Sequence, residues 1–219
     1  MKRAVIVGGA PIGRYDSVRS YLRADDTMIY CDCGLRHAAG LGREADLIVG
    51  DFDSHENPHA AAETIVLPHE KDDTDTCYAA KEALRRGFRD FLLLGVSGAR
   101  LDHTLGNLAL LLMLDTAGAK ALLVDDFSET EIVSREMARV SDRYPYFSLF
   151  NPDGSAKAVT VTGAKYPLTE AALPCEGSLG VSNEPLPGRT AEIRVGEGRL
   201  LLVRVSQAGY SEPRFSRLP

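Results

Sequence analysis

Acidic side chains follow the ends of short apolar runs in the first half of this sequence. The first pair, Asp51 and Asp53, comes directly after the run Leu47–Val49 and a glycine. Two carboxylates one residue apart point the same way along an extended backbone, and they repel each other unless a cation or a proton lies between them. Mg²⁺ prefers one or two carboxylates together with phosphate oxygens. The pair therefore indicates either a magnesium–phosphate site or a solvated acidic turn.

A second acidic cluster, Asp72, Asp73 and Asp75, follows the apolar run Thr64–Leu67 and opens a segment with helical spacing. An aspartate at a helix start accepts hydrogen bonds from free backbone N–H groups, so Asp72 or Asp73 can cap this helix. Three aspartates in four residues exceed what capping requires, and the others can bind a metal ion or position a hydroxyl group. Lys71 beside them can meet a phosphate or offset the local negative charge. Helix capping alone is the alternative explanation.

The third cluster follows the apolar run Phe91–Leu94 and combines glycines with Arg100, Asp102, His103 and Asn107. The glycines permit a loop whose N–H groups face an anion. The guanidinium of Arg100 is a planar fork that suits a phosphate. The other three side chains lie around the start of the next helix, where the helix dipole also favours an anion. The alternative is a tight turn whose aspartate caps that helix.

Asp32 lies at the end of a fourth apolar run, Met28–Tyr30, between Cys31 and Cys33. A C-x-C pair without a second pair is a weak indication of metal binding. The chain has four cysteines and no C-x-x-C motif, and a chain of 219 residues does not need disulfides. We therefore expect reduced, mostly buried thiols.

The apolar runs that carry these clusters are predicted to be strands of one parallel sheet. They alternate with helical segments, of which Asp73–Arg86 and Thr104–Thr116 have the clearest apolar spacing. This alternation favours a parallel sheet covered by helices on both faces. Ligands bind outside the carboxyl ends of such strands, so we expect the clusters to surround one pocket. The expected strands are Val5–Val7, Met28–Tyr30, Leu47–Val49, Thr64–Leu67, Phe91–Leu94 and Leu122–Val124.

The pattern changes after about residue 128, where no long helix is expected and turn signals separate short strands. This texture predicts a small antiparallel sandwich or barrel. We place the domain boundary so that residues 1–128 form the first domain and residues 129–219 the second. The expected strands of the second domain are Glu131–Val140, Tyr146–Phe150, Lys157–Thr162, Thr190–Val195 and Arg199–Val205.

Composition excludes several classes of protein. The net charge is −6, which argues against a nucleic-acid-binding surface. No apolar segment approaches the roughly 20 residues needed to span a bilayer, so we expect no membrane association. The apolar start of the chain is too short for a signal peptide, and we expect a cytoplasmic protein whose first apolar run is a buried strand. The sequence also lacks the G-x-x-x-x-G-K-[ST] loop of P-loop proteins.

In order and spacing, five motifs resemble those of the thiamine pyrophosphokinases, also called thiamine diphosphokinases. The resemblance implies a Rossmann-like α/β domain that binds ATP, followed by an antiparallel β-sandwich domain that binds thiamine. It also implies transfer of the β,γ-diphosphate of ATP to the thiamine hydroxyl, giving thiamine diphosphate and AMP. A homodimer with thiamine at the subunit interface is implied as well. The motifs are Gly50–Ser54, Lys71–Asp75, Arg100–His103, Gly163–Leu168 and Ser178–Asn183.

The resemblance assigns residues to three roles. They are Asp51, Asp53 and Asp75 for Mg²⁺ and catalysis, with Asp72 nearby; Arg100, Asp102, His103 and Asn107 for ATP; and Ser182 and Asn183 for the thiamine pyrimidine. This chain departs from the common pattern at Cys33 and Ala99, where many members have glycine. For the last two motifs the alternative is plain β structure, in which Tyr166 belongs to the core and Ser182-Asn183 is an ordinary turn pair.

We hypothesise that Mg²⁺ held by the three metal candidates bridges the ATP phosphates, while Arg100 offsets their charge. A remaining aspartate, Asp72 or Asp32, then orients the acceptor hydroxyl or takes its proton. Two alternatives are open. In a Mg²⁺-dependent nucleotide phosphohydrolase water replaces the alcohol, and in a non-catalytic nucleotide-binding sensor the β domain docks a partner.

Overall fold

The computed structural model describes residues 2–51, 62–68, 70, 72–154 and 156–206. It divides into two compact units, Met1–Asp126 and Phe127–Pro219. This division lies two residues before the boundary expected from the sequence. Among the described residues, no helix is long and apolar enough to cross a membrane.

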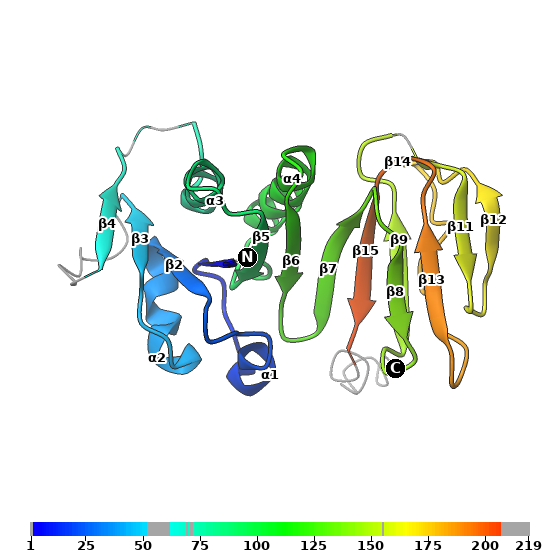
Figure 1. Cartoon of the computed structure of the whole chain (residues 1–219), viewed down its shortest axis with the longest axis horizontal. Helices are drawn as coiled ribbons and strands as arrows, with labels where there is room; N and C mark the ends of the chain where they lie inside the picture. The colour runs from blue at the N-terminus through cyan, green and yellow to red at the C-terminus, as the bar shows by residue number, and fades with distance from the viewer. Residues whose placement is uncertain (1, 52–61, 69, 71, 155, 207–219) are drawn as a thin grey trace, which may run out of the picture. The chain divides into compact units, whose positions relative to one another are not determined.

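The first unit alternates strands with helices, as its apolar pattern predicts (Figure 1). Its elements are β1 (Ala4–Val7), α1 (Tyr15–Arg19), β2 (Thr27–Cys31), the 3-10 helix η1 (Asp32–His37), α2 (Ala38–Leu41), β3 (Leu47–Gly50), β4 (Glu63–Val66), α3 (Asp75–Arg85), β5 (Asp90–Leu94), α4 (Leu101–Thr116) and β6 (Lys120–Val124).

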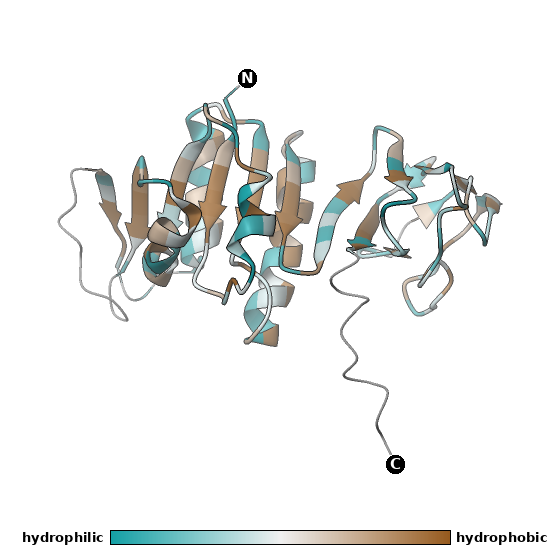
Figure 2. Cartoon of the chain, turned by 90° about the horizontal axis from the view of Figure 1, so that it is seen from below, coloured by the Kyte–Doolittle hydropathy of each residue, from teal (hydrophilic) through white to brown (hydrophobic). Residues whose placement is uncertain are grey.

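The strands of this unit form a parallel sheet in the order β4-β3-β2-β1-β5-β6. Figure 1 places α1 and α2 on one face of this sheet and α3 and α4 on the other. Val5 and Val7 point to the first face, where they pack in one core cluster with Val18 of α1 and Leu41 of α2. Burial on both faces explains why the inner strands β1, β2, β3 and β5 are apolar along most of their length, as the brown strands of Figure 2 show. The edge strand β4 is only partly buried, contrary to the expectation of a buried strand at Thr64–Leu67.

Two helices of this unit begin at residues other than those expected from the sequence. Thr74, and not Asp72 or Asp73, caps α3, because its Oγ1 accepts a hydrogen bond from the backbone N–H of Cys77 at 3.2 Å. Asp73 instead forms an ion pair with Lys81. Helix α4 begins at Leu101, three residues before the expected start, so the cluster after Arg100 lies within its first turns.

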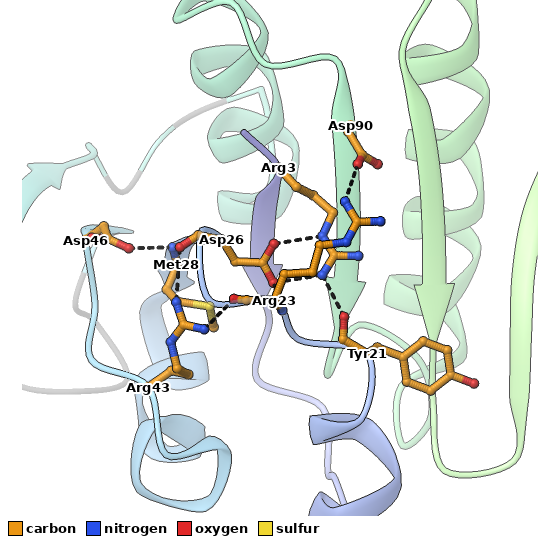
Figure 3. Close-up of polar contacts among 8 residues, drawn as sticks. All are labelled: Arg3, Tyr21, Arg23, Asp26, Met28, Arg43, Asp46 and Asp90. Carbon is orange, nitrogen blue, oxygen red and sulfur yellow. Dashed lines mark hydrogen bonds and ion pairs between the residues drawn. The ribbon is translucent and has the colours of Figure 1, made fainter. Parts of the chain in front are cut away.

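A buried ion pair joins the amino ends of two strands, at the edge opposite the acidic clusters (Figure 3). Arg3 precedes β1 and Asp26 precedes β2, and two hydrogen bonds of 2.9 and 2.7 Å connect their side chains. The backbone N–H of Arg23 also donates to Asp26, at 2.7 Å. These hydrogen bonds fix the relative position of the starts of β1 and β2.

The second unit consists of antiparallel strands on either side of one apolar core. One sheet has the order β7-β15-β9, a second β12-β11-β13-β8, and β10 pairs with β14. This is the sandwich that the resemblance implied. The elements are β7 (Ser128–Val133), β8 (Ala138–Ser141), β9 (Tyr146–Phe150), β10 (Ala156–Lys157), β11 (Val159–Thr162), β12 (Leu168–Ala171), β13 (Thr190–Arg194), β14 (Glu197–Gly198) and β15 (Leu200–Val205).

Two of the strands expected in this unit are each divided in the structure. The expected strand Glu131–Val140 is wrong, because β7 ends at Val133 and β8 starts at Ala138. The expected strand Lys157–Thr162 is interrupted at Ala158, whose φ of +50° is incompatible with an extended backbone.

Candidate active site

The carboxyl edge of the parallel sheet has a switch point between β1 and β5, where the strand order reverses direction. Open α/β sheets bind ligands at such points. The loops that leave the two strands lie against each other, because the N–H of Gly8 donates to Leu94 O and that of Ala10 to Gly95 O. A Cβ atom on Gly8 would lie only 2.7 Å from Gly95 O, so this approach requires glycine.

Asp32 follows β2 at this edge in a conformation that few aspartates adopt. Its φ is +40°, in the left-handed region. Asp32 Oδ2 accepts a contact from the Cys33 thiol at 3.1 Å. Asp32 Oδ1 is buried and has no hydrogen-bond partner among the described residues. Because a buried polar atom without a partner is costly, this oxygen indicates a site for a ligand group or an ion.

Asp51 and Asp75 belong to elements that neighbour β2: Asp51 follows β3, which pairs with β2, and Asp75 begins α3, which packs against β2. Gly50 ends β3, and a Cβ atom on it would lie 3.1 Å from the Cβ of Asp32; Asp51 is the next residue. Asp75 begins α3, and one of its carboxylate oxygens is buried. The pKa of the Cys31 thiol is raised first by burial and then by the negative charges of Asp75 and Asp32. The negative charges of both carboxylates thus act on the same thiol.

The described part of this edge fits a hard cation without completing a site for one. Among the described residues, no group of three or more His, Cys, Asp and Glu side chains is arranged to hold a metal ion. The third expected ligand, Asp53, and the expected phosphate contact Lys71 lie outside the described residues. Carboxylate oxygens are the ligands that Mg²⁺ prefers, and Asp32 Oδ1 is a buried acceptor that no other described residue hydrogen-bonds. The residues present are thus compatible with Mg²⁺.

The other acidic side chains of the second cluster face different surroundings. Asp72 is exposed. The carboxylate of Asp73 accepts two hydrogen bonds from Lys81 Nζ, at 2.8 and 2.7 Å. The Lys81 hydrogen bond therefore lowers the pKa of Asp73, although burial opposes this shift. Asp73 is thus neutralised by Lys81, whereas Asp72 faces solvent.

Arg100 and Asp102 form an exposed ion pair at the start of α4. The guanidinium donates to the carboxylate at 3.2 and 2.5 Å, and this hydrogen bonding lowers the pKa of Asp102 to about 2. About two thirds of each side chain is exposed, at 67% and 65%. Since an exposed pair of this kind contributes little stability, Arg100 can exchange Asp102 for a phosphate at low cost. His103 is exposed beside them.

Asn107 lies deeper than the sequence indicates, with 7% of its surface exposed. Its Oδ1 accepts a hydrogen bond from Thr76 Oγ1 at 2.9 Å, and its Nδ2 donates to Val96 O at 2.8 Å. The side chain thus connects α4 with α3 and with the loop after β5.

In the second unit, Ser182 and Asn183 have contrasting environments. Ser182 is exposed, with a φ of +56°, and its N–H donates to Ser148 Oγ. Asn183 is only 2% exposed; its Oδ1 accepts from the N–H of Tyr166, and its Nδ2 donates to Tyr166 O. This clamp holds Tyr166 on the surface, 56% exposed, where the sequence had allowed a core position. No local sequence signal predicts this contact, because Asn183 and Tyr166 are 17 residues apart in the sequence.

Comparison with known proteins connects both units to one family. The model "Thiamin pyrophosphokinase, catalytic domain" matches residues 18–123, and "Thiamin pyrophosphokinase, vitamin B1 binding domain" matches residues 129–200. The chain is 28% identical over 214 residues to the thiamine pyrophosphokinase of Bacillus subtilis strain 168, an alignment that covers 93% of this chain and 99% of that protein.

Solved structures of similar fold agree with these matches. The crystal structure of thiamin pyrophosphokinase from Geobacillus thermodenitrificans has a TM-score of 0.79 and 28% identity, covering 94% of this chain and 98% of that one. The thiamine pyrophosphokinase structure from Bacillus subtilis has a TM-score of 0.82 at 23% identity, covering 94% and 100% of the two chains, and is similar in fold.

Proposed function

The chain belongs to the thiamine pyrophosphokinase family, and on that premise we propose which of its residues bind the metal ion, the nucleotide and thiamine. It is an enzyme that transfers diphosphate from ATP to the hydroxyl of thiamine, giving thiamine diphosphate and AMP. The observation that carries this conclusion is the order of the two matched domains, catalytic then vitamin B1 binding, along one chain.

The metal-binding part of the proposal involves Asp51 and Asp75, with Asp53 as the ligand outside the described residues. Support comes from the adjacent ends of β2, β3 and the start of α3, and from the buried acceptor Oδ1 of Asp32. Mg²⁺ bound there would offset the charge of the ATP phosphates and polarise the phosphorus that is attacked. The aspartates themselves fix where the diphosphate end of ATP lies.

On the nucleotide side, we assign Arg100 to the phosphates. It leaves Asp102 when ATP arrives, and Asp102 and His103 then line the rim of the nucleotide site. The start of α4 adds the favourable end of a helix dipole. Lys71 is a further candidate for a phosphate contact. Asn107 supports the nucleotide side of the site through its hydrogen bonds to Thr76 and to the loop after β5.

The acceptor hydroxyl needs a carboxylate that can orient it or take its proton. Asp32 suits this role better than Asp72, since its Oδ1 is buried and has an unused acceptor among the described residues, whereas Asp72 is exposed. A carboxylate fixed by its surroundings loses less entropy on holding a hydroxyl than one in solvent. Asp72 is the second candidate for this step.

On the thiamine side, Ser182, whose N–H donates to Ser148 Oγ, can hydrogen-bond the pyrimidine, and Asn183 holds Tyr166 in place. Apolar side chains are exposed around this segment, with Tyr166 at 56%, Leu179 at 51% and Val181 at 38%. Such a surface favours contact with another molecule. We therefore assign it to thiamine and to the second subunit of a homodimer. We place this dimer in the cytoplasm, where ATP is available.

The decisive experiment is incubation of the full chain with ATP, Mg²⁺ and thiamine, followed by identification of the products by mass. Thiamine diphosphate and AMP in equal amounts are expected. A phosphohydrolase would release phosphate or diphosphate whether or not thiamine is present. A nucleotide sensor would bind ATP in calorimetry and leave it intact. Either of these two outcomes would refute the proposed transfer.

Asp75→Asn tests the carboxylate assignment. Because the amide keeps the shape of the side chain but removes a charge that holds the metal and the phosphates, we expect kcat to fall by about 100-fold or more. Urea unfolding should change by less than about 1 kcal/mol. Asp73→Asn is the matched control, since its carboxylate binds Lys81, and it should keep kcat within about threefold. Near-normal turnover of Asp75→Asn would contradict the assignment.

A further inference from the structure

A chain of side-chain hydrogen bonds runs from the start of α3 to the loop after β5. The backbone N–H of Cys77 donates to Thr74 Oγ1 at 3.2 Å, and Thr74 Oγ1 lies 3.1 Å from Thr76 Oγ1. Thr76 Oγ1 is 2.9 Å from Asn107 Oδ1, and Asn107 Nδ2 is 2.8 Å from Val96 O. These hydrogen bonds thereby connect α3 with α4 and with the loop that precedes α4.

The donor and acceptor of each hydrogen bond in this series can be assigned by starting from Val96 O, the last acceptor. Val96 O can only accept, so the amide nitrogen of Asn107 must face it and the amide oxygen must face Thr76. Thr76 therefore donates its hydroxyl proton to Asn107. The hydroxyl of Thr74 must then donate to Thr76 Oγ1, which leaves Thr74 Oγ1 to accept from the Cys77 N–H. Each hydroxyl in this chain thus has one assigned direction.

This series of hydrogen bonds involves the residues on either side of Asp75, to which we assign metal binding. Asp75 lies between Thr74 and Thr76, so the two hydroxyls fix the backbone on both sides of it. Capping does not require the second hydroxyl, because Thr74 already accepts the N–H of Cys77. At the other end, Val96 is the second residue of the loop that leads from β5 to Arg100, and the buried Asn107 holds that loop. The methyl group of Thr76 also lies beside Gly8, the first residue after β1.

We infer that Thr76 and Asn107 are positioning residues that hold Asp75 at a fixed place relative to the nucleotide loop after β5. Their contact determines how well a metal–nucleotide complex is bound, without either side chain having to touch it. Hydrogen bonds behind a metal ligand typically affect metal affinity or activity by 10- to 100-fold when they are removed. The inference rests on the proposed role of Asp75 and deepens it, because it explains why a threonine follows that aspartate.

The test compares two substitutions at residue 76 in the full chain. Thr76→Val keeps the shape and removes the donated hydroxyl, whereas Thr76→Ser keeps the hydroxyl. Binding of Mg²⁺ and ATP without thiamine is measured by calorimetry, and the Mg²⁺ concentration for half-maximal activity is measured separately. Thr76→Val should weaken Mg²⁺–ATP binding and raise the half-maximal Mg²⁺ concentration by about tenfold, whereas Thr76→Ser should stay within about twofold.

A control separates positioning from general loss of stability. Thr116→Val removes a threonine hydroxyl from the far end of α4, where Oγ1 donates to Leu112 O, and should leave both Mg²⁺ quantities unchanged. All measurements are made well below each variant's Tm. If Thr76→Val lowers Tm but binds Mg²⁺–ATP like the wild type, the pair only stabilises the fold and the inference is wrong. If the wild type forms no thiamine diphosphate, the proposed function itself fails, which is a different result.

Discussion

Three residues of the candidate site share a strained backbone conformation. Asp32, Ala99 and Ser182 have φ values of +40°, +52° and +56°, and none of them is glycine. The left-handed region costs an L-residue about 1–2 kcal/mol, and such residues persist where the surrounding structure holds them. Asp32 and Ala99 flank the nucleotide edge, and Ser182 lies in the thiamine-side motif. Among the described residues, these are three of the five non-glycine residues with positive φ; the other two, Ala158 and Glu170, lie outside the segments to which we assign function.

Substitutions at Ala99 can measure this backbone strain directly. Ala99→Gly removes about 1 kcal/mol of left-handed strain but adds about 0.5–1 kcal/mol of unfolded-state entropy, so we expect unfolding free energy to change by less than about 1 kcal/mol. Ala99→Val should lower the unfolding free energy by more than about 1 kcal/mol, because a β-branched residue rarely adopts a positive φ.

Urea unfolding of both variants and of one control provides the comparison. Ala109→Gly in the exposed middle of α4 should destabilise the chain by about 1 kcal/mol, because no strain is relieved there. Equal losses for Ala99→Gly and Ala109→Gly would mean that residue 99 is unstrained in solution.

The sequence indicated which acidic residues to propose for the site, but it did not indicate the side-chain partners of the proposed residues. Asp32 and Asp51 stood out because each follows a short apolar run that forms a buried strand. The run before Asp75 was also expected to be buried, but it forms the edge strand β4, whose residues are only partly buried or exposed. The contact of Asn107 with Thr76 spans 31 residues, and that of Asn183 with Tyr166 spans 17. Periodicity carries no information about such distant contacts, so both asparagines were assigned to ligands and not to the internal hydrogen bonds that the structure places on them.

At the scale of elements, the parallel strands were easier to predict than the antiparallel ones. A strand buried on both faces reads as an unbroken apolar run, and β1, β2, β3 and β5 each begin or end within one residue of the expected bounds. Residues 134–137 separate β7 from β8 without any glycine or proline, so no turn signal marks that break. The strained Ala158 likewise gave no sign of interrupting a strand.

The ion pair that joins β1 and β2 at their amino ends should dominate the stability of that edge (Figure 3). Asp26→Asn leaves the charge of Arg3 buried without its partner, and we expect a loss of about 3 kcal/mol in urea unfolding. Asp16→Asn is the control, because its pair with Arg19 lies on the surface and should contribute less than about 0.5 kcal/mol. Turnover per folded molecule should not change in either variant. A loss below about 1 kcal/mol for Asp26→Asn would contradict this role.

For the whole molecule, the division into two units coincides with the division of the family matches. The catalytic match, residues 18–123, falls within Met1–Asp126, and the vitamin B1 binding match, residues 129–200, falls within Phe127–Pro219. The change from strand–helix alternation to closely spaced strands in the sequence lies near this division. Each unit has its own apolar core, which is the physical reason why the two patterns remain distinct in the sequence.

The stability of the whole chain should fall in two separate steps as the pH is lowered. The first step belongs to His37, whose Nδ1 lies 2.7 Å from the hydroxyl of Tyr15 and whose Nε2 lies 3.0 Å from Ala10 O. Burial lowers the pKa of His37 below its ordinary value of 6.5, the charge of Arg36 adds to this, and the contact with Ala10 O opposes it. The unfolded chain therefore binds a proton first, and stability is lost as the pH falls below about 6.5.

The second step belongs to carboxylates with lowered pKa values, chiefly Asp26. Burial raises the pKa of Asp26, but the hydrogen bonds and charges of Arg3 and Arg23 outweigh burial, so the folded value lies below 3.8. The stability that Asp26 contributes is fully present above its ordinary pKa of 3.8 and is lost as the pH falls from there through the folded pKa. Urea midpoints measured between pH 8 and pH 3 should resolve both steps. His37→Gln should flatten the slope between pH 6.5 and 5 and leave the acid step in place, because glutamine does not titrate. An unchanged slope between pH 6.5 and 5 in that variant would show that His37 is not the group that titrates.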